Sequence, residues 1–412
     1  MSGRGGVGAA ARRLAQRDGH RVMRPIAGSS AMFPLTYVRT GPREQQGRRP
    51  DKSVPVLVIP GGPGLASVVP YASFRSMAAR RALDVVMVEH RGIGLSRRDT
   101  GGEELPVSAV TVEHVIEDLE AVLDHAGIDQ VVVYGCSYGT YLAQAFAARY
   151  PDRVSAMVLD STMLSVEDDL AAVRAHRRRL FWDGVDPALA PVAAAVRQLA
   201  ADGVPMIELD RVVQLVYEFA GPQALHRLLL ARQKGRLQRT WDYVSRLGAE
   251  ELDGAGRPYL IEPELVAGIM YEELGYALPR DGHPLDPQLA LTTTPRPAYR
   301  GEPFSLPAEL PQFTWPTVVI SGERDLRTPP PIAHRVANLI PGAQVLPLAG
   351  TGHSALDTHP LAALHAIRAA VEGTLANIPH DARAIAALPR RGTSRLVGSA
   401  LNVVVTATTR RP

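Results

Sequence analysis

The chain of 412 residues contains a single cysteine, Cys136, and this scarcity excludes several kinds of protein. One cysteine cannot form an internal disulfide, and it rules out a cysteine-rich metal site. No apolar run approaches the length of a membrane-spanning helix, and residues 1–24 lack the apolar segment of a signal peptide. We therefore expect a cytoplasmic protein without membrane association, in which residues 1–24 are a flexible leader.

A strong excess of either charge is also missing. The 45 basic and 42 acidic side chains leave a formal net charge of only +3, which does not call for nucleic acid or for an acidic partner. Hydrophobic residues make up 46% of the chain, an ordinary value for a soluble globular protein. The length fits one large α/β domain with an insertion, or two domains.

The most informative stretch is residues 131–147. A short β-branched and aromatic run, Val131–Tyr134, predicts a buried strand, and apolar residues at helical spacing follow Gly139. Between them lies Gly-Cys-Ser-Tyr-Gly, a G-x-S-x-G pattern in the strand–turn–helix context of a nucleophile elbow. Ser137 would then present its hydroxyl above the sheet at a helix N-terminus. A surface serine in a glycine-containing turn is the alternative.

Strands and helices alternate along the first part of the chain. This rhythm indicates a mostly parallel, doubly wound α/β sheet. Strand-like runs occupy residues 33–40, 54–60, 83–88, 131–134 and 153–159, and an amphipathic helix is predicted over residues 112–125.

The alternation of strand and helix patterns stops near residue 163 and resumes at residue 317. Residues 166–276 show almost only helical patterns, and Gly/Pro-rich loops follow to residue 311. Strand signals return at residues 317–321 and 345–348. We interpret the interruption as an inserted helical cap that covers the active-site face and shapes access to it. The domains are predicted as residues 25–163 and 313–376 for the two halves of the core, 164–312 for the cap and 377–412 for a flexible basic tail.

Two further residues complete a catalytic constellation. Asp325 follows the strand at residues 317–321, and His353 follows the strand at residues 345–348. The chain order Ser137, Asp325, His353, with each residue just past a strand end, is the order expected for a serine nucleophile on this type of sheet. His353 would take the serine proton and later protonate the leaving group, while Asp325 would hold the imidazole tautomer.

Each of these residues also has an ordinary interpretation. His353 is alternatively a loop histidine, and Asp325 alternatively an acid at a helix N-terminus. Asp160 and Glu323 are the reserve candidates for the acid. Cys136, beside the nucleophile, is expected to pack as a small buried apolar residue.

Two loops at strand ends carry further signals. The segment Pro-Gly-Gly-Pro-Gly at residues 60–64 exposes backbone N–H groups and can supply half of an oxyanion hole, or it is a plain turn. The segment Glu-His-Arg-Gly-Ile-Gly-Leu-Ser at residues 89–96 suits a tight loop at the carboxyl end of a strand. Its Arg91 is more consistent with a structural ion pair than with a substrate contact.

With these motifs, residues 30–375 resemble the α/β-hydrolase superfamily, and within it the proline iminopeptidase and tripeptidyl aminopeptidase group of serine peptidases. Residues 60–64 are similar to that group's His-Gly-Gly-Pro-Gly loop, and residues 89–96 to its Asp-Gln-Arg-Gly-x-Gly-x-Ser segment. The elbow, Leu159-Asp160-Ser161, Asp325 with Thr328-Pro329, and Gly352-His353 match the other landmarks. Two departures are Pro60 in place of His and Glu89-His90 in place of Asp-Gln.

The resemblance implies an α/β-hydrolase fold and a site that needs no metal or organic cofactor. It further implies that the backbone N–H groups of Gly62 and Tyr138 form the oxyanion hole. That group also holds the substrate's free α-amine with acidic cap residues. Glu272 and Glu273 are the candidates here, although paired carboxylates on a helix are often only a solvated face.

Three functional hypotheses follow. The first is an aminopeptidase that releases an N-terminal residue, proline-type, or a short peptide. The second is a serine esterase, lactonase or amidase acting on a small apolar substrate, because a fold alone does not fix a function. The third, a non-catalytic ligand-binding relative, is disfavoured by the intact triad pattern. Dehalogenase and epoxide hydrolase chemistry is disfavoured because the elbow carries Ser rather than Asp.

Overall fold

Within the described residues, the strands form one eight-stranded sheet with the order β1-β2-β4-β3-β5-β6-β7-β8. The computed structural model describes residues 3–42, 54–247, 256–291 and 295–390. β1 and β2 pair antiparallel, β2 also pairs antiparallel with β4, and the remaining neighbours are parallel. The strands are β1 (Gly19–Pro25), β2 (Met32–Thr40), β3 (Val56–Ile59), β4 (Val85–Val88), β5 (Val131–Cys136), β6 (Val154–Asp160), β7 (Thr317–Gly322) and β8 (Gln344–Leu348).

Helices cover both faces of the sheet. Alternate strand residues point to opposite faces, and each set packs into its own apolar cluster. One cluster contains residues of α3 (Val112–His125), α4 (Tyr138–Arg149) and α13 (Pro330–Leu339). The other contains residues of α2 (Ala72–Ala79), α15 (Pro360–Val371) and α16 (Ile378–Ala386). The predicted α/β-hydrolase fold class, a mostly parallel doubly wound sheet with an inserted helical cap, is confirmed.

The described residues near both ends of the chain are more ordered than the sequence predicts. The flexible leader predicted over residues 1–24 is wrong, because α1 (Gly3–Asp18) buries Ala11 and β1 pairs with β2 along its whole length. An edge strand has one open side and can be largely polar, so β1 shows no apolar run. The tail predicted to be flexible from residue 377 contains α16, which buries Ile378 and Ile385. Residues 391–412 lie outside the described residues.

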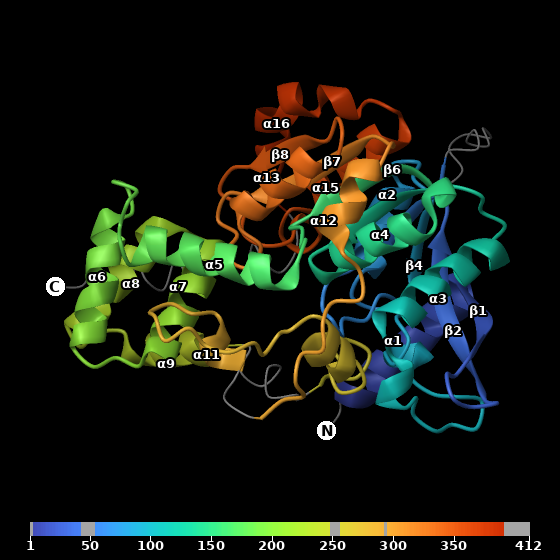
Figure 1. Ribbon diagram of the computed structural model, residues 1–412, viewed down its shortest axis with the longest axis horizontal. Coiled ribbons are helices and arrows are strands. Elements are labelled where there is room, and N and C mark those ends of the chain that lie inside the picture. Colours follow the sequence, from blue (N-terminus) through green and yellow to red (C-terminus); the bar gives the residue numbers. More distant parts are fainter. Residues whose placement is uncertain (1–2, 43–53, 248–255, 292–294, 391–412) are drawn as a thin grey trace.

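The cap forms a separate apolar cluster of its own. Figure 1 shows α5 to α9 grouped beside the sheet. These helices share a core with Trp241 and Leu228 fully buried, and Leu326 from the core domain packs into it. The helices are α5 (Val166–Phe181), α6 (Ala190–Ala201), α7 (Met206–Ala220), α8 (Pro222–Gln233) and α9 (Gln238–Arg246).

The later part of the predicted cap has two packing partners: residues near 261–276 pack on the core domain, whereas Leu285 packs into the cap cluster and Asp281 and Asp286 pair with α5. A π-helix at Gly268–Glu273 buries Ile269 in the apolar cluster that contains residues of α3 and α4. Leu65 pairs with Ile261 in an isolated β-bridge. Helical periodicity predicts which face is apolar but not which partner covers it. This region also contains two short helices, α11 (Gln288–Leu291) and α12 (Leu306–Glu309). A further short helix, α14 (Ala355–Thr358), follows β8.

Arg91 makes the structural ion pair that the sequence suggested. Its guanidinium donates two hydrogen bonds to the Asp118 carboxylate, at 2.7 and 2.6 Å, and one to the carbonyl of Ala109 at 2.8 Å. Both side chains are almost fully buried, and Arg24 adds a third bond to Asp118 at 2.8 Å. This pair fixes the loop after β4 to α3.

None of the helices in the part of the chain that the structure describes is long and apolar enough to cross a membrane.

Asp118→Asn tests this buried pair. The substitution keeps the shape but removes the counter-charge of a buried guanidinium, so we expect the free energy of unfolding to fall by about 3 kcal/mol. Urea unfolding measures the change. The matched control is Glu104→Gln, which removes an exposed partner of Arg97 and Arg98 and should cost less than about 1 kcal/mol. Equal losses in both variants would contradict the structural role of the pair.

Candidate active site

Ser137 occupies a sharp turn between β5 and α4. Its backbone has φ 53° and ψ −123°, a strained conformation for a residue with a side chain. The apolar strand before it is buried on both faces, and α4 starts immediately after it. The elbow predicted from the sequence is therefore present in the structure.

The two glycines of the motif are required by close backbone contacts. A Cβ on Gly135 would lie 2.4 Å from the carbonyl oxygen of Gly139, and one on Gly139 would lie 2.2 Å from that of Ile59. Neither space accepts a methyl group without moving backbone. The elbow, the following helix and the end of β3 thus pack together without intervening side chains.

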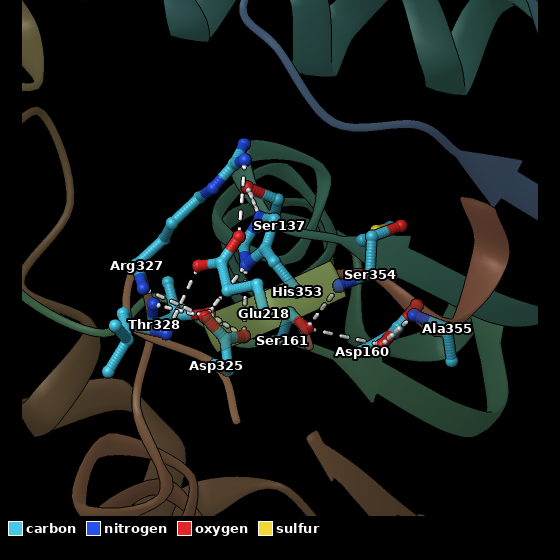
Figure 2. A network of polar contacts seen from close by, with 12 residues as sticks. Ser137, Asp160, Ser161, Glu218, Asp325, Arg327, Thr328, His353, Ser354 and Ala355 are labelled. Carbon is cyan, nitrogen blue, oxygen red and sulfur yellow. Dashed lines mark hydrogen bonds and ion pairs between the residues drawn. The ribbon is translucent and has the colours of Figure 1, made fainter. Parts of the chain in front are cut away.

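The structure brings Ser137, His353 and Asp325 together. Nε2 of His353 lies 2.9 Å from Oγ of Ser137, and Nδ1 lies 2.9 and 3.0 Å from the two carboxylate oxygens of Asp325. Figure 2 shows the imidazole between the other two side chains. The arrangement is that of a nucleophile, a base and an orienting acid.

Asp325 is held as a carboxylate. It is fully buried, and it accepts hydrogen bonds from the N–H groups of Arg327 and Thr328 and from the Thr328 hydroxyl, each at 2.9 Å. Burial alone raises the pKa of Asp325, but the attraction of His353 and these hydrogen bonds lower it to about 2. For His353, burial opposes the charged imidazolium, but Asp325 outweighs it and raises the pKa above its ordinary value.

Asp160, a reserve acid, has a different role. Its carboxylate accepts the N–H groups of Ala355 and Leu356, at 3.0 and 2.9 Å, and the Tyr134 hydroxyl at 2.7 Å. Ser161 accepts the N–H of Ser354 at 2.8 Å. These contacts anchor the residues immediately after His353 to the end of β6 (Figure 2).

Neither Glu323 nor Cys136 joins the triad. Glu323 is exposed and accepts the N–H of Gly350 at 2.5 Å. Cys136 is buried, as expected, and its thiol donates to the Ser354 hydroxyl at 3.1 Å. Burial raises the pKa of the Cys136 thiol well above its ordinary value, so it is held as the neutral thiol.

The glycine-rich loop at residues 60–64 packs directly against the nucleophile. A Cβ on Gly61 would lie 3.2 Å from Cβ of Ser137. The Gly62 carbonyl accepts a hydrogen bond from the Tyr276 hydroxyl at 3.4 Å. Tyr138 is the first residue of α4, where backbone N–H groups lack partners within the helix. Gly62 and Tyr138 thus belong to the two segments that border Ser137, and their role as oxyanion donors stays a prediction.

Glu89 and His90, which stand where the resembled group has Asp-Gln, contact the segment after the glycine-rich loop and the start of α4. Glu89 is fully buried and accepts the N–H groups of Ser67 and Val68, at 2.6 and 3.0 Å. Burial raises the pKa of Glu89 to about 7, against the effect of these hydrogen bonds. Nε2 of His90 lies 3.2 Å from the Tyr138 hydroxyl, and burial lowers the pKa of His90 to about 4.

The two candidates for the substrate amine already have partners in the protein. Glu273 accepts the N–H of Val112 at 2.9 Å, at the N-terminus of α3. Glu272 pairs with Arg300 at 3.1 Å. Their substrate-binding role stays a prediction, and these contacts supply a structural reason for both carboxylates.

Sequence reasoning missed the cap residues that hold the Asp325 loop. Arg177 of α5 donates to the carbonyl of Leu326 at 2.9 Å, and Glu218 of α7 accepts the N–H of Leu326 at 3.2 Å. Glu218 also pairs with Arg327 at 3.3 Å. A buried acid in an amphipathic helix, such as Glu218, is the only sequence signal, and it does not identify the partner.

These groups can perform nucleophilic catalysis by serine. Within the described residues, no group of three or more His, Cys, Asp or Glu side chains is arranged to hold a metal ion.

Comparisons with known proteins agree with this fold. Residues 54–196 match a family model described as "alpha/beta hydrolase fold". A probable proline iminopeptidase of Leptolyngbya boryana is 24% identical over 336 residues, which cover 81% of this chain and 91% of that protein. The proline iminopeptidase of Neisseria meningitidis serogroup A is 31% identical over 120 residues, 29% of this chain and 36% of that protein.

Among solved structures, a proline iminopeptidase of Mycobacterium smegmatis aligns with a TM-score of 0.47 and 17% identity, covering 94% of this chain and 100% of that one. A thermophilic esterase from Thermogutta terrifontis aligns with a TM-score of 0.43 and 18% identity, covering 89% and 99%. The family-model match over residues 54–196 and the sheet topology lead to one conclusion: this chain has an α/β-hydrolase fold.

Proposed function

We propose that this protein is a serine hydrolase that works through an acyl-enzyme on Ser137, and that it is an aminopeptidase. The observation that carries the proposal is the position of His353, within hydrogen-bond distance of both Ser137 and Asp325. Serine is a poor nucleophile near neutral pH unless a base removes its proton. This geometry gives it that base.

The mechanism assigns each residue one task. Ser137 attacks the scissile carbonyl while Nε2 of His353 takes its proton, and the same nitrogen then protonates the departing amine. Asp325 stabilises the imidazolium and keeps Nδ1 protonated. The N–H groups of Gly62 and Tyr138 would stabilise the oxyanion. Water then attacks the acyl-enzyme, with His353 again as the base.

Similarity to proteins named proline iminopeptidase supports a peptide substrate with a free N-terminus, released as one residue or as a short peptide. A carboxylate in the cap region would hold the α-amine. Glu272 and Glu273 are the candidates from the sequence.

A serine esterase, lactonase or amidase is the second candidate. The observation in its favour is that Glu272 and Glu273 both have protein partners, which leaves the amine site of an aminopeptidase without a dedicated carboxylate at those positions. Such an enzyme would not distinguish free from acetylated amines.

The substrate class is tested with a small panel: aminoacyl and tripeptidyl coumarin amides with free amines, their N-acetyl forms, and a p-nitrophenyl ester. We expect cleavage of the free-amine amides and none of the acetylated ones. Ser137→Ala should reduce kcat by about 10⁶-fold, while the circular dichroism spectrum stays that of the wild type. Ester turnover without any amide cleavage would contradict the aminopeptidase, and retained turnover in pure Ser137→Ala would contradict the serine mechanism.

The pH dependence tests the acid of the triad. The base must be neutral, so kcat/KM should fall as the pH drops through the pKa of His353, which Asp325 raises above 6.5. Asp325→Asn removes that attraction, so the acid limb should move to lower pH and kcat should fall by about 10⁴-fold. Glu323→Gln, two residues away, is the matched control and should change neither value. The assignment of Asp325 fails if the two variants behave alike.

A further inference from the structure

Arg327 lies two residues after the acid of the triad and has no task in the mechanism. Its side chain is 43% exposed, and its pairing with Glu218 is a single contact at 3.3 Å. Figure 2 shows its long side chain extending from the Asp325 loop to the carboxylate of Glu218. The guanidinium also interacts electrostatically with Asp325 and with His353. A cation therefore stands beside the reacting groups.

Arginines with a structural role in this protein, such as Arg91 and Arg177, are buried and donate several hydrogen bonds. Arg91 makes two bonds to Asp118 and one to a carbonyl, with only 1% of its side chain exposed. Arg177 donates to Leu326, Asp210 and Gln214, with 4% exposed. Five N–H donors on a guanidinium form a fork suited to a planar carboxylate. Among the ion pairs of the described residues, the Arg327 guanidinium takes part in one, with Glu218.

The charge on Arg327 also works against the chemistry proposed for the site. Catalysis converts His353 to an imidazolium, and the nearby Arg327 disfavours that form, because it lowers the pKa of His353. A bound anion on Arg327 would offset this repulsion during catalysis. Glu218 also opposes the repulsion, because its carboxylate raises the pKa of His353, and a substrate anion would add to this effect.

We propose that Arg327 forms an anion subsite beside the triad, and that the substrate carries a carboxylate which pairs with this guanidinium. The inference rests on the proposed serine hydrolase function and specifies its substrate class as acidic. Within a peptide, the carboxylate would be an acidic side chain or the free C-terminus of a very short substrate. Glu218 keeps the guanidinium oriented while its remaining donors receive the substrate.

The test compares two free-amine substrates that differ in the charge of one side chain: the coumarin amides of glutamate, joined through its α-carboxyl, and of glutamine. The readout is the ratio of kcat/KM for the charged substrate to that for the neutral substrate. We expect the ratio to fall by about 10- to 100-fold in Arg327→Gln, the size of a charge-assisted hydrogen bond. Arg327→Lys should retain part of it as a point charge. Added salt should lower the wild-type ratio, because the site is half-exposed.

Arg335→Gln is the matched control, because Arg335 is 44% exposed and pairs with Asp168 at 2.7 Å on the surface. It should leave the ratio unchanged. Inhibition of glutaminyl-amide hydrolysis by free adipate, a dicarboxylate, provides a second readout that does not depend on which side of the scissile bond the carboxylate occupies. The subsite is refuted if the ratio and the adipate inhibition constant are the same in Arg327→Gln and Arg335→Gln.

Failure of the proposed function gives a distinct result. In that case neither coumarin amide is hydrolysed faster by the wild type than by Ser137→Ala. The subsite is then judged by adipate binding alone in isothermal titration calorimetry. Binding that weakens at least about tenfold in Arg327→Gln supports it, and equal binding overturns it.

Discussion

The position of the nucleophile depends on close backbone contact between the end of β3, the turn after β5 and the start of α4. Gly139 allows this contact, since a methyl group there would lie 2.2 Å from the carbonyl oxygen of Ile59. The contact places the loop at residues 60–64 against Ser137 and fixes the strained backbone of the serine. The nucleophile and the predicted oxyanion donors are therefore positioned by one packing arrangement.

The sheet positions the other two residues of the triad, Asp325 and His353, relative to Ser137. Asp325 and His353 follow β7 and β8, and parallel strands end at the same edge as β5. Asp160 secures the residues after His353, and Arg177 and Glu218 of the cap secure the residues after Asp325. The cap helices thus contribute to the geometry of the acid. Arg327 pairs with Glu218 of the cap and lies two residues after Asp325 in the chain.

Much of this was predictable from the sequence, for a physical reason. Central parallel strands are buried on both faces, so β5 and β7 appear as short apolar runs, and the residues just past their ends can be compared in order. The edge strand β1 has no such run. Glu218 and Arg327 could not be paired in advance, because they come from an inserted helix and a core loop that only tertiary packing brings together. The same limit applies to Glu273, which contacts α3.

The most direct measurement of the central claim is intact-protein mass spectrometry after reaction with a fluorophosphonate, followed by peptide mapping. The account predicts one adduct on Ser137 in the wild type, and slowing by about 10³-fold or more in His353→Gln, because the serine then lacks its base. An adduct on another residue, or labelling of Ser137 at the same rate in both proteins, would contradict it.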